Sequence, residues 1–296
     1  MPGELKFLMT VDVESFSIPR NRCDEEAARQ VYRQGLPRVL DVFSRYDVLA
    51  TFYFTGEFAA QVPEAIDLVK ENQHEIGCHG YYHEVDRAFD MLSLDEQVAD
   101  LKKAKVLIES VAGRIASFRA PALRINENTA RALEITGFTS DSSVCPQRFD
   151  GPFTFGSRQK LRWFFAHRMP YFLDQNCSVL EIPISALLVP YIGTTMRISP
   201  SAIRMLEKVL FFESNQTGRP IVFIFHPNEC LDFHGDISPT RRTNNPVQSF
   251  FADTIRQRLK VKNLGERAVL HLANILSRAR RSGFTFITAS ELRKYY

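Results

Sequence analysis

Apolar residues fall into short runs and helix-spaced stretches that alternate along the chain. Runs of β-branched and aromatic residues, typical of buried strands, occur at 5–13, 48–55, 74–78, 117–120, 179–184, 221–225 and 284–288, and another extended piece begins at 138. Between them, apolar residues three or four positions apart predict helices over 31–45, 59–72, 94–112, 127–136 and 200–216. Strands that alternate with helices of this length favour βα units and a parallel sheet. Seven or eight such units predict an irregular (β/α) barrel.

Several of these helices carry capping signals. Ser93 and Glu96 form a capping box at the start of the helix that Gly113 ends. Asn126 is expected to cap the following helix, and Ser290 the last helical turn.

Composition and charge narrow the class of protein. With 296 residues, of which 45% are hydrophobic, the chain can bury a sizeable core, and no break in composition divides it. We therefore expect a single α/β domain over 1–296, with a mobile polar loop at 232–247. The formal net charge of +3 is small and scattered, so a nucleic-acid partner is not expected.

The N-terminal sequence and the pattern of cysteines bear on the cellular location of the protein. The first six residues lead directly into a strand without the pattern of a secretory signal, and the five cysteines form no Cys-x-x-Cys pair. We expect a cytoplasmic protein. The segment 161–172 mixes aromatic, apolar and basic residues, which suits contact with the inner face of a membrane, a glycan-stacking lip or an ordinary barrel helix.

Chemically apt side chains follow the predicted strands. They are Asp12, Glu14, His79, Arg119, Asp141 and His226. Because the carboxyl ends of parallel strands converge on one mouth of a barrel, these residues are expected to share a rim. Taken singly, each could be a turn cap, an ion-pair partner or a buried histidine, but their joint occurrence at strand ends favours a functional site.

A metal site is the chemistry that these residues suit. His79 and His83 lie four positions apart, and imidazoles with a carboxylate are typical ligands of a borderline divalent ion. A site with three protein ligands leaves a position for water, which points to metal-assisted hydrolysis. Since residues i and i+2 of a strand point the same way, Asp12 and Glu14 can both face the mouth while Val13 packs into the wall.

Seven segments together carry a family resemblance. They are Thr-Val-Asp-Val-Glu at 10–14, Ala-Thr-Phe-Tyr-Phe at 50–54, Glu-Ile-Gly-Cys-His-Gly-Tyr-Tyr-His at 75–83, Phe-Arg-Ala-Pro at 118–121, Asp-Ser-Ser at 141–143, Leu-Glu-Ile-Pro at 180–183 and Phe-His-Pro-Asn-Glu at 225–229. As an ordered set they resemble the polysaccharide deacetylases, carbohydrate esterase family 4. The resemblance implies an irregular (β/α)7-type barrel that holds one divalent metal and removes N-acetyl groups from amino sugars.

The resemblance also implies roles for individual residues. Asp12 resembles the general base, Arg119 the residue that orients it, and His226 the general acid. His79 and His83 resemble metal ligands.

One position departs from the family pattern. In many members a metal-binding aspartate directly follows the base, where this chain has Val13. Glu14 is therefore the expected third ligand, with Asp12 as the alternative. Zinc is the expected ion, and Fe, Co, Ni and Mn are alternatives.

Other readings of the same site stay open. The substrate is expected to be an N-acetylated sugar, nucleotide-linked, lipid-linked or part of an unfinished glycan. The protein could instead be a deformylase of a lipid-linked amino sugar, a cyclic-amide hydrolase or, because of Val13, a non-catalytic sugar-binding protein. A two-His-one-carboxylate iron oxygenase ranks last, since it has no use for Arg119 and His226.

Overall fold

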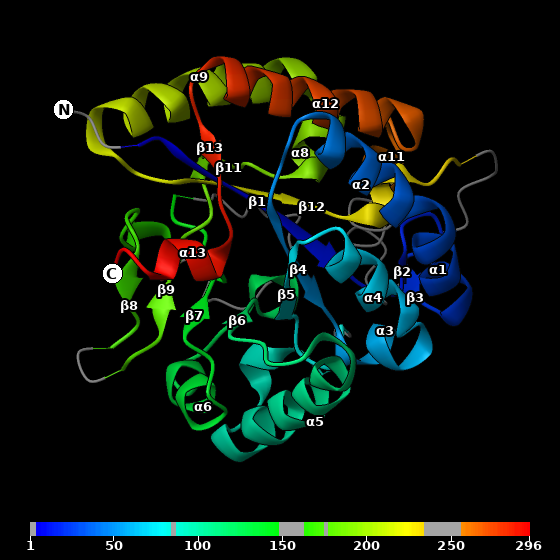
Figure 1. Ribbon diagram of the computed structural model, residues 1–296, viewed down its shortest axis with the longest axis vertical. Coiled ribbons are helices and arrows are strands. Elements are labelled where there is room, and N and C mark those ends of the chain that lie inside the picture. Colours follow the sequence, from blue (N-terminus) through cyan, green and yellow to red (C-terminus); the bar gives the residue numbers. More distant parts are fainter. Residues whose placement is uncertain (1–3, 84–86, 148–162, 175–176, 234–255) are drawn as a thin grey trace, which may run out of the picture.

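A curled, largely parallel sheet forms the centre of the protein (Figure 1). The computed structural model describes residues 4–83, 87–147, 163–174, 177–233 and 256–296. Within these ranges the strand order is β12 (Ile221–Phe225), β1 (Lys6–Val13), β4 (Ala50–Phe54), β5 (Glu75–Cys78), β6 (Ser117–Phe118), β7 (Ser140–Asp141), β9 (Leu180–Glu181) and β8 (Tyr171–Phe172). Only β8 pairs antiparallel in this described set, and β13 (Thr285–Phe286) pairs with the start of β1.

The sheet curls into an incomplete barrel. Strands β9 and β12 stand at its two sides, and Ser185 connects them, because its backbone N–H donates to the Val222 carbonyl at 3.2 Å and its Oγ accepts from the Val222 N–H at 3.0 Å. The predicted irregular α/β barrel is thereby confirmed. The segment 234–247 of the predicted mobile loop lies outside the described residues.

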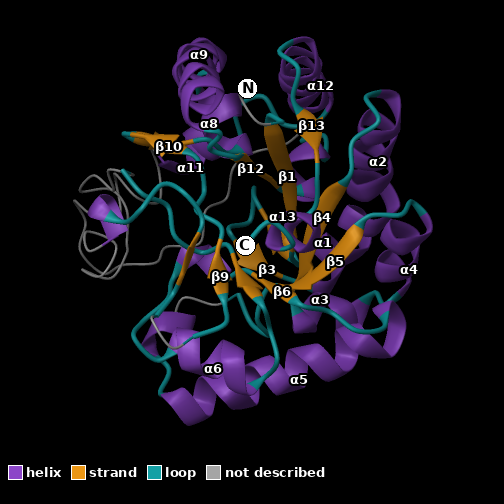
Figure 2. Cartoon of the chain, turned by 60° about the vertical axis from the view of Figure 1, so that its left-hand side comes forward, coloured by secondary structure: helices purple, strands orange, loops and turns teal. Residues whose placement is uncertain are grey.

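Helices surround this sheet (Figure 2). They are α1 (Glu25–Gln30), α2 (Leu36–Arg45), α3 (Gly56–Gln61), α4 (Glu64–Glu71), α5 (Leu94–Ala112), α6 (Thr129–Ile135), α8 (Gly193–Ile198), α9 (Pro200–Thr217), α11 (Arg256–Lys260), α12 (Glu266–Arg281) and α13 (Ala289–Arg293). Short hairpins pair β2 (Phe16–Ser17) with β3 (Arg22–Cys23) and β10 (Ala186–Leu187) with β11 (Val189–Pro190). No helix in the described part of the chain is long and apolar enough to cross a membrane.

Two of the predicted helices differ in their limits. The helix expected at 31–45 begins earlier, at Glu25, where the Asp24 side chain accepts from the Ala27 N–H, and it includes a π-helical turn at Val31–Gly35. The helix expected at 59–72 is broken into α3 and α4 at Pro63, because proline has no N–H for the preceding turn.

Two of the expected caps are also wrong. The structure begins α6 after Asn128, and the Asn126 side chain instead accepts from the Asn128 N–H at 2.9 Å. Thr288, not Ser290, caps α13 through a capping box. The Ser93 box and the Gly113 end of α5 are as predicted.

The two faces of β1 explain where the site lies. Phe7, Met9, Val11 and Val13 belong to the large core between the sheet and the helices. The alternate residues point into the barrel: Leu8 packs in the smaller apolar core, whereas Thr10 and Asp12 are polar and buried. The barrel interior thus changes from apolar to polar toward the carboxyl ends of the strands. Val13 packs away from the mouth, as expected.

Candidate metal centre and hydrolytic site

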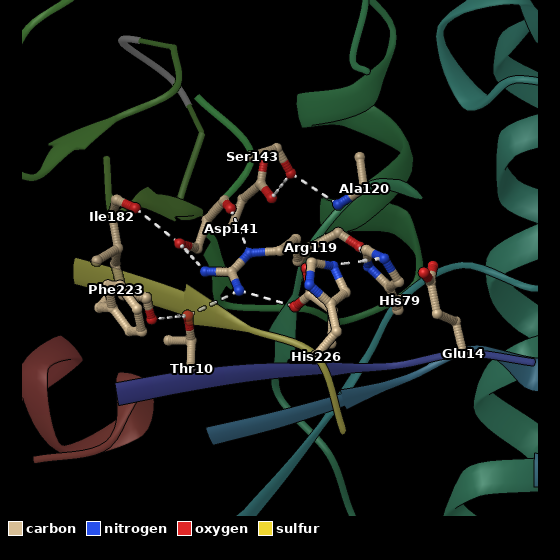
Figure 3. Close-up of polar contacts among 12 residues, drawn as sticks. Thr10, Glu14, His79, Arg119, Ala120, Asp141, Ser143, Ile182, Phe223 and His226 are labelled. Carbon is tan, nitrogen blue, oxygen red and sulfur yellow. Dashed lines mark hydrogen bonds and ion pairs between the residues drawn. The ribbon is translucent and has the colours of Figure 1, made fainter. Parts of the chain in front are cut away.

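Glu14, His79 and His83 each offer one ligand atom to a common point, and these atoms all lie within 4.8 Å of one another. Glu14 follows β1, and His79 follows β5, where its backbone N–H continues the ladder by donating to Phe54 at 2.8 Å. The structure therefore brings together the three predicted ligands. Figure 3 shows the Glu14 carboxylate beside the His79 imidazole.

The ring of His79 is held in the orientation that a ligand needs. Its Nδ1 lies 2.8 Å from the Arg119 carbonyl oxygen, so Nδ1–H donates and Nε2 keeps its lone pair for the site. Burial, together with the neighbouring His83, lowers the pKa of His79 to about 4 against the opposing charge of Asp12. His79 is therefore neutral at pH 7, the state in which imidazole binds metals.

The donor set fits a divalent cation. Oε2 of Glu14 is buried and has no hydrogen-bond partner among the residues that the structure describes. It lies 3.1 Å from Nε2 of His83. A buried carboxylate oxygen without a donor is costly unless a positive group neutralises it, and two imidazoles with one carboxylate suit zinc and other borderline divalent ions.

Arg119 organises the opposite side of this cluster (Figure 3). The guanidinium is fully buried, and its Nη1 donates to Oδ1 of Asp12 and to Oγ1 of Thr10, each at 2.8 Å. Its Nε and Nη2 donate to the carbonyl and the hydroxyl of Ser142, again at 2.8 Å. Four directed bonds thus fix the planar group against Asp12.

The carboxyl group of Asp12 is ionised in this setting. Burial acts to raise its pKa, but the positive charge of Arg119, with contributions from His79 and His226, holds the pKa below its usual value. Oδ2 of Asp12 lies 3.9 Å from Nε2 of both histidines. Asp12 thus stands between the candidate ligand His79 and the candidate acid His226.

His226 follows β12 and is set up to carry a proton. Its Nδ1 lies 3.0 Å from Oε1 of Glu229. Burial acts to lower its pKa, but the hydrogen bond to Glu229 and the negative charges of Glu14, Glu229 and Asp12 raise it to about 9. The imidazole is therefore protonated at neutral pH. Glu229 is the carboxylate in direct contact with the His226 ring.

Asp141 does not join the cluster. It is fully buried beside Glu181 on the neighbouring strand, and Oγ of Ser143 donates to it while accepting from the Ala120 N–H at 2.8 Å. Burial raises the pKa of Asp141 to about 6, and burial with the nearby negative charge raises that of Glu181 well above its usual value. These raised pKa values favour a proton on one of the two carboxyl groups, and Ser143 links Asp141 to the backbone of Ala120, next to Arg119.

Some functional neighbours are absent from the residues proposed on sequence. Thr10 contacts Arg119 and lies two positions before Asp12, so strand alternation gave a usable signal for it. Arg197 forms an ion pair with Glu229 from α8, and no local pattern marks that pairing.

Part of the chain matches a known family. Residues 26–140 match the family described as Polysaccharide deacetylase. Over this segment the chain is similar to the polysaccharide deacetylases.

Two curated proteins are similar to this chain over part of its length. The peptidoglycan deacetylase-like protein FGM2 of Gibberella zeae is 33% identical over 117 residues, which are 38% of this chain and 33% of the relative. The peptidoglycan deacetylase of Helicobacter pylori is 28% identical over 115 residues, 39% of each protein. The aligned part of the chain thus spans between a third and two fifths of these relatives.

The likeness in fold to solved structures extends over the whole chain. A Mycobacterium smegmatis protein assigned to the polysaccharide deacetylases superposes with a TM-score of 0.62 at 18% identity, covering 100% of this chain and 94% of that one. A family 4 pseudoenzyme from Bacillus anthracis gives 0.53 at 14% identity, covering 99% and 66%. At such identities the agreement concerns the fold.

Proposed function

We propose that the protein is a metal-dependent hydrolase that removes the acetyl group from an N-acetylated amino sugar. One observation carries the proposal: a neutral His79, a second imidazole and a carboxylate offer ligand atoms within 4.8 Å of one another, beside the ionised Asp12 and the protonated His226. The similarity of residues 26–140 to the polysaccharide deacetylases supports the same chemistry.

Glu14, His79 and His83 would hold the cation, with zinc as the proposed ion and Fe, Co, Ni or Mn as alternatives. When bound, a divalent cation supplies Lewis acidity, which polarises an acyl oxygen and makes water easier to deprotonate.

The other side chains divide the proton transfers between them. The carboxylate of Asp12 accepts a proton from the attacking water, and Arg119 holds that carboxylate in place through Oδ1, leaving Oδ2 for the transfer. His226 donates the proton on Nε2 to the departing amine, so that acetate and a free amino sugar leave the site. A base with a low pKa and an acid with a high pKa are both in their working forms at neutral pH.

A glycan that contains N-acetylated sugars is the proposed substrate. The two curated relatives are named for deacetylation of peptidoglycan, which supports a bacterial-type glycan as the first compound to test. Nucleotide-linked and lipid-linked N-acetyl sugars are the further candidates. The cytoplasmic location expected from the sequence stays a prediction.

The decisive experiment measures the released acid. Purified protein is incubated with N-acetylated glycan fragments, nucleotide-linked N-acetyl sugars and N-formyl analogues, and acetate, formate and free amine are quantified. Acetate in equal amount to free amine is expected, and it should disappear in His79→Ala. Formate release alone would support a deformylase, and glycan binding without any hydrolysis by metal-containing protein would overturn the enzymatic proposal.

A further inference from the structure

A buried ion pair lies behind His226. Glu229, in the 3-10 turn Pro227–Cys230, uses its two oxygens for different partners. Oε1 lies 3.0 Å from Nδ1 of His226, and Oε2 accepts from Nε of Arg197, which comes from α8. The side chains of Arg197 and Glu229 are both 1% exposed.

The surroundings of this pair are shaped to hold it. A Cβ atom built on Gly193 would lie 2.5 Å from Oε1 and 2.7 Å from Oε2 of Glu229, so the close approach of the carboxylate depends on glycine there. Nη1 of Arg197 donates to the carbonyls of Lys260 and Lys262 at 2.5 and 2.8 Å.

The stability of the folded protein does not by itself explain why an ion pair is buried here. Removing two charges from water costs several kcal/mol for each, and apolar replacements are often as stable. Here the pair ends on an imidazole whose other nitrogen, Nε2, lies 3.9 Å from Oδ2 of Asp12. Glu229 thus contacts His226 in the way that other carboxylates fix the tautomer and the orientation of catalytic or metal-ligating histidines.

We propose that Arg197 and Glu229 are positioning residues: Arg197 holds the Glu229 carboxylate against Nδ1 of His226, which fixes the ring with Nε2 directed into the hydrolytic site. The catalytic meaning of this arrangement rests on the proposed function, whereas the fixing of the ring does not. Within the described residues, the titratable groups whose charges act on His226 are Glu229, Glu14 and Asp12, and Arg197 is the cation that pairs with Glu229.

The chain contains a matched pair away from the site. Glu207 in α9 accepts from Tyr191 Oη and from Nε of Arg278 in α12, each at 2.8 Å. Like Glu229, it is a buried glutamate bonded on one side to arginine and on the other to a ring side chain. The ring differs, because Tyr191 lies in the core and does not face Asp12, and the arginine is more exposed, with 32% of the Arg278 side chain accessible.

The experiment compares Glu229→Gln and Arg197→Lys with Glu207→Gln and Arg278→Lys in the intact, metal-containing protein. Ring ¹⁵N shifts of His226 report its tautomer and its titration, and the pH dependence of kcat/KM reports the titration of the catalytic acid.

For Glu229→Gln we expect the titration midpoint of His226 to fall by about one pH unit or more, with the alkaline limb of the kcat/KM profile moving equally. The kcat should fall about tenfold or more with little change in KM. Arg197→Lys should give a smaller shift in the same direction.

The controls should lose stability without moving either the His226 spectrum or the pH profile. An unchanged ring tautomer and midpoint in folded Glu229→Gln, or an equal change in Glu207→Gln, would overturn the proposal. If Glu229→Gln does not fold, Arg197→Lys retains the positive charge and provides the same readouts. A wild-type protein without deacetylase activity would defeat the proposed function, while the ¹⁵N spectra would still decide whether Glu229 fixes His226.

Discussion

Oε2 of Glu14 lies 3.1 Å from Nε2 of His83, and in the described structure no hydrogen bond satisfies that oxygen. Glu14, two residues beyond Asp12, thus lies close to the two histidines, whereas the side chain of Val13 between them is turned into the core. The alternation of side chains along the strand therefore puts the carboxylate at position 14 rather than 13 within reach of the histidines.

Removing Glu14 should release the metal. Because the loss of groups that merely support metal ligands costs about 10–100-fold in affinity, we expect Glu14→Ala and His79→Ala to weaken metal binding by at least that factor. Elemental analysis of purified variants gives the metal content per chain. Glu207→Gln, in the ion pair between α9 and α12, serves as the control and should keep its metal. Retention by Glu14→Ala together with loss by Asp12→Ala would make Asp12 the ligand.

Activity should decline in alkali as His226 loses its proton. The pKa of His226 is raised to about 9, so the donor form predominates below that pH and disappears above it. On the acid side, activity should fall only well below neutrality, because the pKa of Asp12 is lowered. His226→Ala should reduce kcat by about 10²–10⁴-fold and abolish the alkaline limb, as measured by pH–rate profiles.

The corresponding control is His271→Ala on α12, which should leave the profile unchanged. An alkaline limb that persists in His226→Ala would show that another group is the acid.

Glu181→Gln should stabilise the protein increasingly as pH rises. The folded state raises the pKa of Glu181, so the native carboxyl keeps its proton where the unfolded one has released it, and stability falls as pH rises through that interval. Glutamine keeps the acceptor for the Val144 N–H and cannot ionise. Urea unfolding at pH 5 and pH 8 should show a gain of about 1 kcal/mol or more at pH 8 relative to pH 5. A gain that does not depend on pH would contradict the raised pKa of Glu181.

The sequence suggests that the segment 161–172 suits contact with a membrane surface, and the part of this segment that the structure describes, from residue 163 onward, allows a test. Positions 161 and 162 lie outside the described residues, but the turn Trp163–Phe165 presents Phe165 with 89% of its surface exposed. Phe165→Ser should abolish sedimentation with anionic vesicles. Phe212→Ser, which removes another exposed phenylalanine on α9, should not. Equal behaviour of the two variants would exclude a specific interfacial segment.

The sequence predicted those parts of the site that depend on strand ends. Asp12, His79, Arg119 and His226 each follow or end a parallel strand, and the fold itself then makes them neighbours. The alternation of β1 also placed Val13 and Glu14 on the correct sides. Pairings between distant segments gave no such signal, because neither the contact of Arg197 with Glu229 nor that of Asp141 with Glu181 follows from a local period. Pro63 is visible in the sequence, but the helical spacing of apolar residues on both sides of it predicted one continuous helix.

Strand β1 lies between β4 and β12, and its Thr10 hydroxyl bonds a carbonyl 213 residues later in the chain. During translation, β1 therefore stays without one of its two neighbours until the β12 segment, about 213 residues later, has emerged. Such a long-range closure predicts slow folding. Until then the edge of β1 on the nascent chain is open to pairing with another strand.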